Sequence, residues 1–281
     1  MFPQNIGPYL SIDETSLSQG ELYTIITNKE AKGKNGSIVA IIEGTKAEDI
    51  IAVVEKIGIK ERKQVQEVTL DLAGNMALAI KRSFPNATQV IDRFHVEQLA
   101  SEALQEIRIK HRWNAIDAEN EAIEVSKKLK IPFQAEVFEN GDTLKQLLAR
   151  SRHLLYKHQN NWSKTQQQRA DLLFDKYPDI KKAYELTQQL KLVFASSKNK
   201  MIAFTRLARW HNAVEFVGFK AFNTISKTIE LHHRKILNYF DNKSTNASAE
   251  SFNAKIKAFR AQFRGVRDIN FFLFRIAKLY A

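Results

Sequence analysis

The sequence contains no cysteine. Disulfide bonds, cysteine-ligated zinc sites and thiol catalysis are therefore excluded, and we expect the protein in the cytoplasm. Glycine and proline are also scarce, at 10 and 5 residues in a chain of 281, which excludes a β-sandwich and favours long helices. No apolar run approaches the roughly 18 residues that cross a bilayer, and no basic stretch leads into an apolar one at the amino terminus, so we expect neither export nor membrane insertion.

The composition is otherwise that of a folded protein, with 44% hydrophobic and 26% charged residues, which excludes disorder as the main state. Lysine and arginine outnumber the acidic residues by 43 to 31. The excess is concentrated in residues 232–281, which hold ten basic and three acidic residues. Such a segment is typical of proteins that bind nucleic-acid phosphates, although a surface that serves only solubility would carry the same charge.

Hydrophobic periodicity divides the first part of the chain into strands and helices. Strands are predicted at 9–16, 21–28, 38–42, 65–72 and 88–91, and helices at 46–57 and 74–84. The order βββαβαβ, with an antiparallel meander followed by two helix-linked strands, is that of a ribonuclease-H-like fold. We therefore expect an α/β fold with a mixed sheet in residues 1–95.

Two acidic residues lie near the ends of predicted strands, on the faces opposite their apolar side chains. These are Asp13 and Asp71. Adjacent parallel strands bring their carboxyl ends to one edge of a sheet, so the two carboxylates could meet there. Converging carboxylates repel unless a cation neutralises them, which makes the pair a candidate Mg²⁺ or Mn²⁺ site. The alternative is that each aspartate simply ends a strand and faces water.

Helical periodicity dominates after residue 96 and forms several apolar stripes that we expect to be core. The turns at 132–141 and 177–179 are too short to link independent domains. We therefore expect residues 96–240 to be an all-helical insertion that interrupts the ribonuclease-H-like core before its last catalytic helix. Residues 241–281 would then return to the core and add that helix and a basic tail.

Glu250 lies in the first turn of this last helix, which Thr245 or Asn246 would cap. Its buried stripe is predicted to be Phe252, Ile256, Phe259 and Phe263. The opposite face presents Glu250, then Asn253, Lys257, Arg260 and Arg264. An acid at the positive end of a helix dipole is favourable on any surface helix. Glu250 is thus either a dipole-complementing surface residue or a functional acid, and the cations either a solvated face or phosphate contacts.

Four blocks of sequence, in this order, resemble the DDE transposases of bacterial insertion sequences, specifically the ISL-three family. They are Ile12-Asp13-Glu14, Thr69-Leu70-Asp71, the stretch 83–87 leading into Asp92-Arg93-Phe94-His95, and the stretch 236–240 followed by Thr245 to Lys257. The resemblance covers nearly the whole chain. It implies a ribonuclease-H-like core split by a helical insertion, in which Asp13, Asp71 and Glu250 form the acidic triad.

The same resemblance implies further site residues. Asp92 and His95 match the family's Asp-x-x-His block and, with Asn253, would support the site. Asp92 is also the alternative to Asp71 for the second acid. Asp92 could instead be only a helix cap, and His95 a histidine packed beneath it. The cations assigned to the DNA backbone are Lys255, Lys257, Arg260, Arg264 and Arg267. Trp210 resembles an insertion-domain tryptophan that braces DNA ends, although a tryptophan on a helical stripe is also typical of a core.

We therefore expect a Mg²⁺- or Mn²⁺-dependent polynucleotidyl transferase that uses two ions to cut DNA at insertion-sequence ends and to join the freed 3′-hydroxyl to target DNA. Family members usually carry an amino-terminal zinc module and helix-turn-helix, which this sequence lacks, so end recognition is expected to reside in another module or polypeptide. Its partners would be the two DNA ends and the target, bound by a homodimer or larger assembly at the nucleoid. The alternatives are an inactive DNA-binding remnant and a structure-selective nuclease on the same fold.

Overall fold

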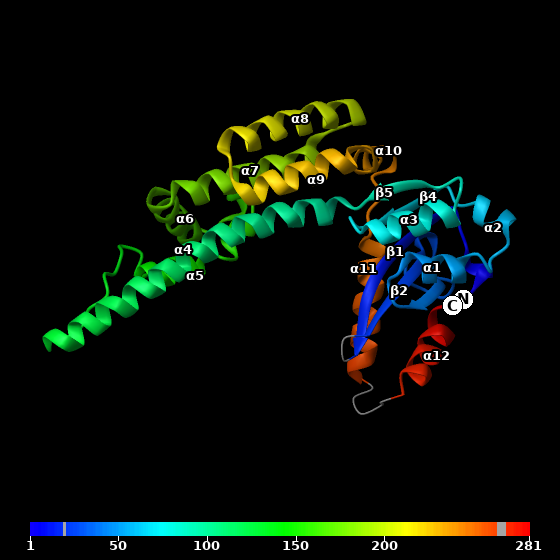
Figure 1. Cartoon of the computed structure of the whole chain (residues 1–281), viewed down its shortest axis with the longest axis horizontal. Helices are drawn as coiled ribbons and strands as arrows, with labels where there is room; N and C mark the ends of the chain where they lie inside the picture. The colour runs from blue at the N-terminus through cyan, green and yellow to red at the C-terminus, as the bar shows by residue number, and fades with distance from the viewer. Residues whose placement is uncertain (19–20, 263–267) are drawn as a thin grey trace. The chain divides into compact units, whose positions relative to one another are not determined.

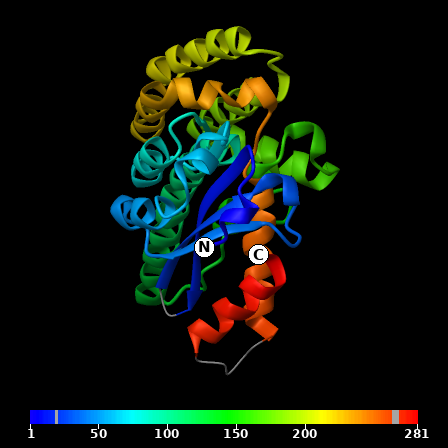
Figure 2. The same cartoon turned by 90° about the vertical axis from the view of Figure 1, so that its right-hand side faces the viewer.

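The computed structural model describes residues 1–18, 21–262 and 268–281, and it divides the chain into two compact units (Figures 1 and 2). Met1–Val96 and His232–Ala281 form one unit, called here the sheet unit, and Glu97–Leu231 form the other, called the helical unit. Residues 232–240, expected in the insertion, group with the sheet unit. Along the described ranges, no helix combines the length and the apolar character that crossing a membrane requires.

A mixed five-stranded sheet forms the centre of the sheet unit, in the order β3-β2-β1-β4-β5. The strands are β1 (Tyr9–Ser18), β2 (Glu21–Asn28), β3 (Ile38–Glu43), β4 (Glu67–Leu70) and β5 (Thr88–Ile91). β1, β2 and β3 are antiparallel, whereas β4 pairs parallel to β1 and β5 parallel to β4. The expectation of an α/β fold with a mixed sheet is confirmed, and β1, β4 and β5 all end at the same edge.

The helices of the sheet unit cover both faces of this sheet. They are α1 (Ala47–Val54), α2 (Ile59–Lys63), α3 (Gly74–Ser83), α10 (Tyr239–Asn242), α11 (Ala247–Gln262) and α12 (Ile269–Tyr280). One face packs Leu10 and Ile12 of β1 against α1 and α3. The other face packs Ile25 of β2 against Phe252 of α11 and against α12. The helix expected at 46–57 is shorter than predicted, because the chain turns after α1 and starts α2 behind Gly58.

The described part of the helical unit is entirely helical apart from its connections and one isolated β-bridge. Its helices are the main part of α4 (Arg93–Leu129), then α5 (Leu144–Arg150), α6 (Lys164–Lys176), α7 (Pro178–Ser196), α8 (Lys200–Val217) and the main part of α9 (Lys220–Leu237). The expected stripes are buried at Leu147, Leu186, Leu190 and Val214. α4 and α9 each continue into the sheet unit and are the two places where the chain passes between the units.

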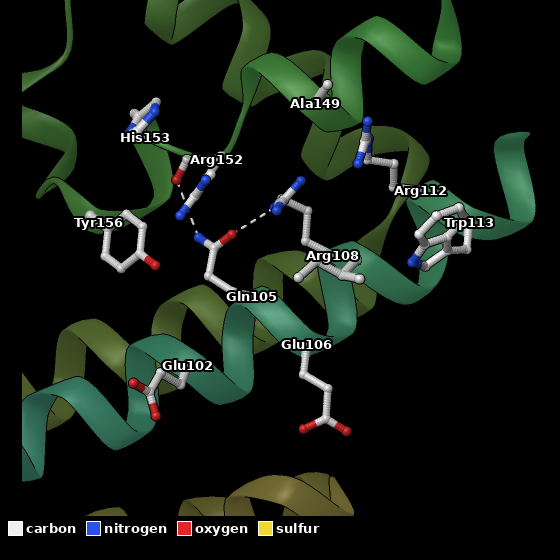
Figure 3. A pocket seen from close by; sticks show the side chains of 11 residues that line it. Glu102, Gln105, Glu106, Arg108, Arg112, Trp113, Ala149, Arg152, His153 and Tyr156 are labelled. Atoms are coloured by element: carbon white, nitrogen blue, oxygen red, sulfur yellow. Dashed lines mark hydrogen bonds between the residues drawn. The ribbon is translucent and has the colours of Figure 1, made fainter. Parts of the chain in front are cut away.

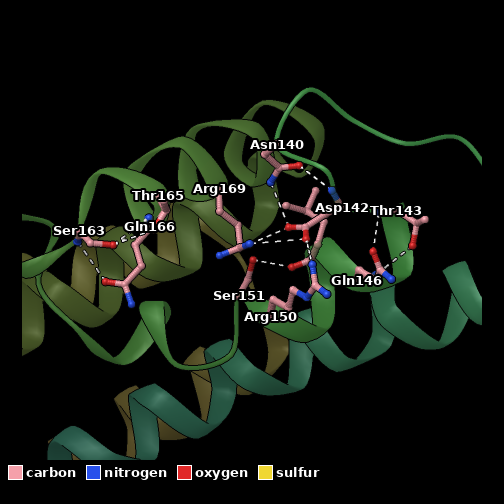
Figure 4. A network of polar contacts seen from close by, with 11 residues as sticks. Asn140, Asp142, Thr143, Gln146, Arg150, Ser151, Ser163, Thr165, Gln166 and Arg169 are labelled. Atoms are coloured by element: carbon pink, nitrogen blue, oxygen red, sulfur yellow. Dashed lines mark hydrogen bonds and ion pairs between the residues drawn. The ribbon is translucent and has the colours of Figure 1, made fainter.

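A buried carboxylate organises the polar interior of the helical unit. Asp142 is 0% exposed and accepts hydrogen bonds from Arg150 and from Nε of Arg169, the latter at 2.7 Å (Figure 4). Burial alone would raise the pKa of Asp142, but the two guanidinium groups hold it below its ordinary value. Asp142 precedes the capping box that Thr143 and Gln146 form at the start of α5, so the pairs fix α5 beside α6.

Candidate active site

Asp13 lies on β1 with its side chain on the face that α11 covers. Its Oδ1 accepts the backbone N–H of Glu14 at 2.8 Å, and its Oδ2 accepts Nδ2 of Asn253 at 2.7 Å. Asn253 lies on α11 beside the buried stripe and is 8% exposed. Its amide thus orients the carboxylate of Asp13 and ties α11 to β1, which is the supporting role that the resemblance implies for Asn253.

Asp71 directly follows β4, at the edge where the parallel strands end. Its Oδ1 accepts the N–H of Ala73 at 2.7 Å, so Asp71 also fixes the turn into α3. Its negative charge raises the pKa of both Asp13 and Glu14, in addition to the larger effect of burial on each. The structure therefore brings Asp71 to the same site as Asp13. Glu14, which the sequence analysis named only as part of a motif, is a third acid at this site.

Asp92 directly follows β5 and is 1% exposed. Its Oδ1 accepts the N–H of Phe94 at 3.2 Å and caps α4, as the helix-cap interpretation predicts. Its Oδ2 accepts the N–H of Asn246 at 3.1 Å, and Nδ2 of Asn246 donates to the carbonyl of Ile12 at 3.4 Å. These bonds attach the beginning of α11 to the end of β5 and to the middle of β1.

Asp92, His95 and Glu250 form a compact group of potential metal ligands. One ligand atom from each lies within 4.8 Å of the other two. Nε2 of His95 is buried and has no hydrogen-bond partner among the residues that the structure describes. Glu250, in the first turn of α11, is exposed. A cation bound here would contact the imidazole of His95 and the carboxylates of Asp92 and Glu250.

The site carries more negative charge than its own residues neutralise. Burial raises the pKa of Asp13 first, and the charge of Asp71 adds to it, against the hydrogen bonds from Glu14 and Asn253 and the charge of His95. Burial likewise raises the pKa of Glu250, with further contributions from the charges of Asp92 and Asp13 that His95 partly offsets. Because each carboxylate destabilises its neighbours when ionised, the site favours a bound cation.

A partly buried lysine lies close to Asp92, and no sequence pattern indicated it. Nζ of Lys29 donates to Oγ1 of Thr69 at 2.7 Å and lies 3.5 Å from Oε1 of Glu67. Burial lowers the pKa of Lys29, whereas the charges of Glu67 and Asp92 act in the opposite direction. Lys29 follows β2 in a segment whose sequence is typical of a polar surface turn. Only the fold shows that its ammonium group compensates the buried carboxylates of Glu67 and Asp92.

The cations expected to contact DNA fall into three groups. Lys257 is exposed on α11. Nζ of Lys255 donates to the carbonyl of Gly33 at 3.0 Å, and the guanidinium of Arg260 lies over the ring of Phe272, 5.1 Å from its centroid. Arg264 and Arg267 lie outside the described residues, as does Phe263 of the predicted stripe. DNA binding by this row stays a prediction.

The position of Trp210 differs from the DNA-bracing role that the resemblance implies. It is 2% exposed in the helical unit, and its indole N–H donates to the carbonyl of Leu186 at 2.8 Å. A ring enclosed in this way has no face on which a DNA base could stack, so the core interpretation of the helical stripe holds and the DNA-bracing role does not. The tryptophan that the helical unit does expose is Trp113, at 57%.

Replacing Trp210 by alanine is expected to lower the free energy of unfolding by about 3–5 kcal/mol, because the change leaves a large cavity in the core. Trp113→Ala is the matched control, since it removes the same side chain from an exposed position and should change stability by less than about 0.5 kcal/mol. Denaturant unfolding followed by circular dichroism measures both. Equal effects of the two substitutions would contradict the burial of Trp210.

Comparison with known proteins gives a family model, described as transposase of the ISL3 (ISL-three) group of DDE enzymes, that matches residues 10–276. The transposase of insertion sequence element IS1001 from Bordetella parapertussis is 22% identical over 272 residues, which cover 95% of this chain and 60% of that protein. The transposase of IS1557 from Mycobacterium tuberculosis is 24% identical over 250 residues, or 88% and 54% of the two chains. The chain thus spans little more than half the length of these relatives.

Proposed function

Because the chain belongs to the ISL3 family of DDE transposases, we propose that it cuts DNA strands at insertion-sequence ends and joins them to target DNA. The observation that supports this most directly is the proximity of Asp13 to both Asp71 and Glu250. Asp13 couples electrostatically to each of the other two, although the three come from β1, the end of β4 and α11. Phosphoryl transfer depends mainly on positioning and charge stabilisation, and this site offers both.

The donor set fits hard divalent cations, since it consists of carboxylate oxygens that repel one another, with one imidazole beside them. We propose that Asp13, Asp71 and Glu250 hold two Mg²⁺ or Mn²⁺ ions, with Asp92 as the alternative to Asp71. Bound ions would supply an activated water and charge stabilisation at the phosphate oxygens. The chain itself orients Asp13 through Asn253 and fixes Glu250 by holding the start of α11 against Asp92.

We propose a ribonuclease-H-like core for the sheet unit. The sheet order β3-β2-β1-β4-β5, with β4 and β5 parallel to β1, supports it. In this proposal residues 96–240 are the insertion between the fifth strand and the last catalytic helix, flanked by core residues 1–95 and 241–281. The division of the chain after residue 96 supports an insertion of this kind.

DNA would be held through its phosphates. Lys257 is the exposed cation of α11 nearest in sequence to Glu250 and Asn253 on the same face, and we propose it as a backbone contact together with Lys255 and Arg260. A transposase acts on two element ends, which favours a homodimer or larger assembly, and end recognition is assigned to a separate module or polypeptide. A protein with these substrates would work at the nucleoid.

A strand-transfer assay tests the proposal. A duplex ending in the element's own terminal sequence, with a free 3′-hydroxyl, is incubated with supercoiled plasmid and Mg²⁺. Joined products are the expected result, and chelation of Mg²⁺ should abolish them. Nicking without joining would instead indicate a structure-selective nuclease, and neither activity in the presence of DNA binding would indicate an inactive remnant.

Divalent cations are expected to stabilise the folded chain, because their charge offsets the burial and the mutual repulsion that raise the pKa of Asp13, Glu14 and Glu250. At a concentration a hundred times the dissociation constant, binding adds about 2.7 kcal/mol. Without metal, the raised pKa values make the folded chain less stable at higher pH. Their contribution to stability is fully present below the pKa of the unfolded chain and is lost as the pH rises through the pKa of the folded chain.

Thermal melts at neutral pH in Mn²⁺ and in chelator measure this prediction. Glu250→Gln should melt at or above the wild-type temperature in chelator and should lose most of the Mn²⁺-induced increase. Glu55→Gln, an exposed glutamate of the sheet unit, is the control and should behave as wild type. An unchanged Mn²⁺ shift in Glu250→Gln would contradict a metal site at this residue.

A further inference from the structure

A pocket of about 850 Å³ opens on the helical unit, between α4 and the chain that follows α5 (Figure 3). We call it the arginine pocket, because Arg108 and Arg112 of α4 and Arg152 line it together with Gln105, Trp113 and Tyr156. It lies wholly within the helical unit, so its geometry is independent of the acidic site. Nothing in the proposed chemistry of strand cleavage uses these residues.

The buried member of the three is held rigidly. Arg108 is 5% exposed; its Nε donates to Oε1 of Gln105 at 2.6 Å, and an Nη donates to the carbonyl of Leu148 at 2.7 Å. Nε2 of Gln105 in turn donates to the carbonyl of Arg152 at 3.1 Å, which fixes the chain on the other side of the pocket. Arg108 and the backbone at Arg152 are thus held in place before anything binds.

The positive charge of the pocket is not neutralised by the nearby acids. Burial lowers the pKa of Arg108, and the charges of Arg112 and Arg152 lower it further, so the guanidinium groups repel one another. Nε of Arg112 is buried and has no hydrogen-bond partner among the described residues. Glu102 and Glu106 also line the pocket, but among the described residues neither forms an ion pair with its arginines, and Glu106 points away from them in Figure 3. Guanidinium groups placed in this way are suited to phosphate.

Aromatic side chains stand beside this charge. Trp113 is 57% exposed and Tyr156 is 42% exposed. Exposed aromatic rings next to arginines are the arrangement that binds single-stranded nucleic acid, because each base offers a face for stacking while the arginines hold the backbone. In duplex DNA these faces are occupied by neighbouring bases, so an unpaired nucleotide fits the pocket better than a duplex.

We propose that the arginine pocket binds one strand of DNA at an unpaired nucleotide, with the phosphate at Arg112 and Arg152 and the base against Trp113. The inference takes from the family only that the chain meets DNA. It goes beyond strand cleavage, since it gives the helical unit its own contact with DNA and directs that contact to unpaired strands.

Binding of a fluorescent single-stranded oligothymidylate to the full chain, measured by anisotropy in chelator, tests the proposal without any requirement for cleavage. Trp113→Ala should weaken this binding by about tenfold. Its effect on a duplex of the same length should be below about twofold, since a duplex offers no free base to stack. Arg112→Gln should reduce the slope of log affinity against log salt by about 0.7, the loss of one phosphate contact.

Matched controls are available in the same unit. Phe216→Ala removes an aromatic ring that is 92% exposed, and Lys110→Gln removes an exposed charge from α4; both should leave single-strand binding unchanged. Equal losses in Trp113→Ala and Phe216→Ala, or equal losses on single strand and duplex, would overturn the proposal. Competition by inorganic phosphate that depends on Arg112, with no effect of Trp113→Ala, would also overturn it and indicate a free-anion site.

Discussion

Replacing Glu250 by glutamine is expected to lower the rate of DNA cleavage by at least about a thousandfold, the loss of several kcal/mol of charge stabilisation. Glutamine keeps the size and the helix position of the side chain but removes the charge that would bind a cation beside Asp92 and His95. DNA affinity and its dependence on salt should be unchanged, because the proposed phosphate contacts involve other side chains. Single-turnover cleavage of a labelled duplex and a parallel binding assay measure the two effects.

Glu55→Gln is the control for this substitution, since it makes the same change at an exposed position of the sheet unit and should keep full activity. Cleavage by Glu250→Gln at the wild-type rate would remove Glu250 from the mechanism. A parallel loss of DNA binding would show that the substitution acts through folding or phosphate contact, which the proposed role does not allow.

Substitutions of Asp71 and Asp92 are expected to differ in their effect on stability. Asp71→Asn should lower cleavage by about a thousandfold or more without a fall in melting temperature, because the amide oxygen can keep the hydrogen bond that Asp71 accepts from the N–H of Ala73. Asp92→Asn should also cost about 1–3 kcal/mol of unfolding free energy. Both oxygens of Asp92 accept backbone N–H groups, so an amide nitrogen would face one of those donors.

Cleavage assays and thermal melts of the two variants, with the exposed Asp117→Asn as the control, measure this difference. If Asp71→Asn cleaves normally while Asp92→Asn is inactive but keeps its stability, Asp92 is the second acid and Asp71 belongs to the turn before α3. Loss of stability in Asp71→Asn would show that its hydrogen bond to Ala73 matters more to the fold than its charge does to the chemistry.

The strands could be predicted from the sequence because alternation records which side of a strand is buried. Leu10 and Ile12 face one core, and Asp13 lies on the opposite face of β1, although in the middle of the strand and not near its end as predicted. The same logic placed the buried stripe of α11. It placed the end of α1 too late, at residue 57 instead of Val54, because the apolar spacing includes Ile57, and it did not predict the short helix α2 after Gly58.

The composition of the site could be predicted only in part. Periodicity and strand ends indicated that Asp13, Asp71 and Glu250 occupy suitable places, but whether they meet depends on contacts between distant parts of the chain. The N–H of Asn246 binds a carboxylate 154 positions earlier, and no local pattern encodes that pairing. Lys29 was missed for the same reason, since a polar turn residue shows its burial only when β4 lies beside it.

The attachment of Asn246 to Asp92 and Ile12 also has a consequence for the life of the protein in the cell. The strands that carry the first acids emerge from the ribosome before α11, whose first cap contact, Asn246, lies 154 positions after Asp92. Segments made earlier generally begin to fold first. A nascent or prematurely terminated chain therefore holds the early carboxylates without the helix that completes them. Under the proposed function, such incomplete chains would be unable to cut DNA.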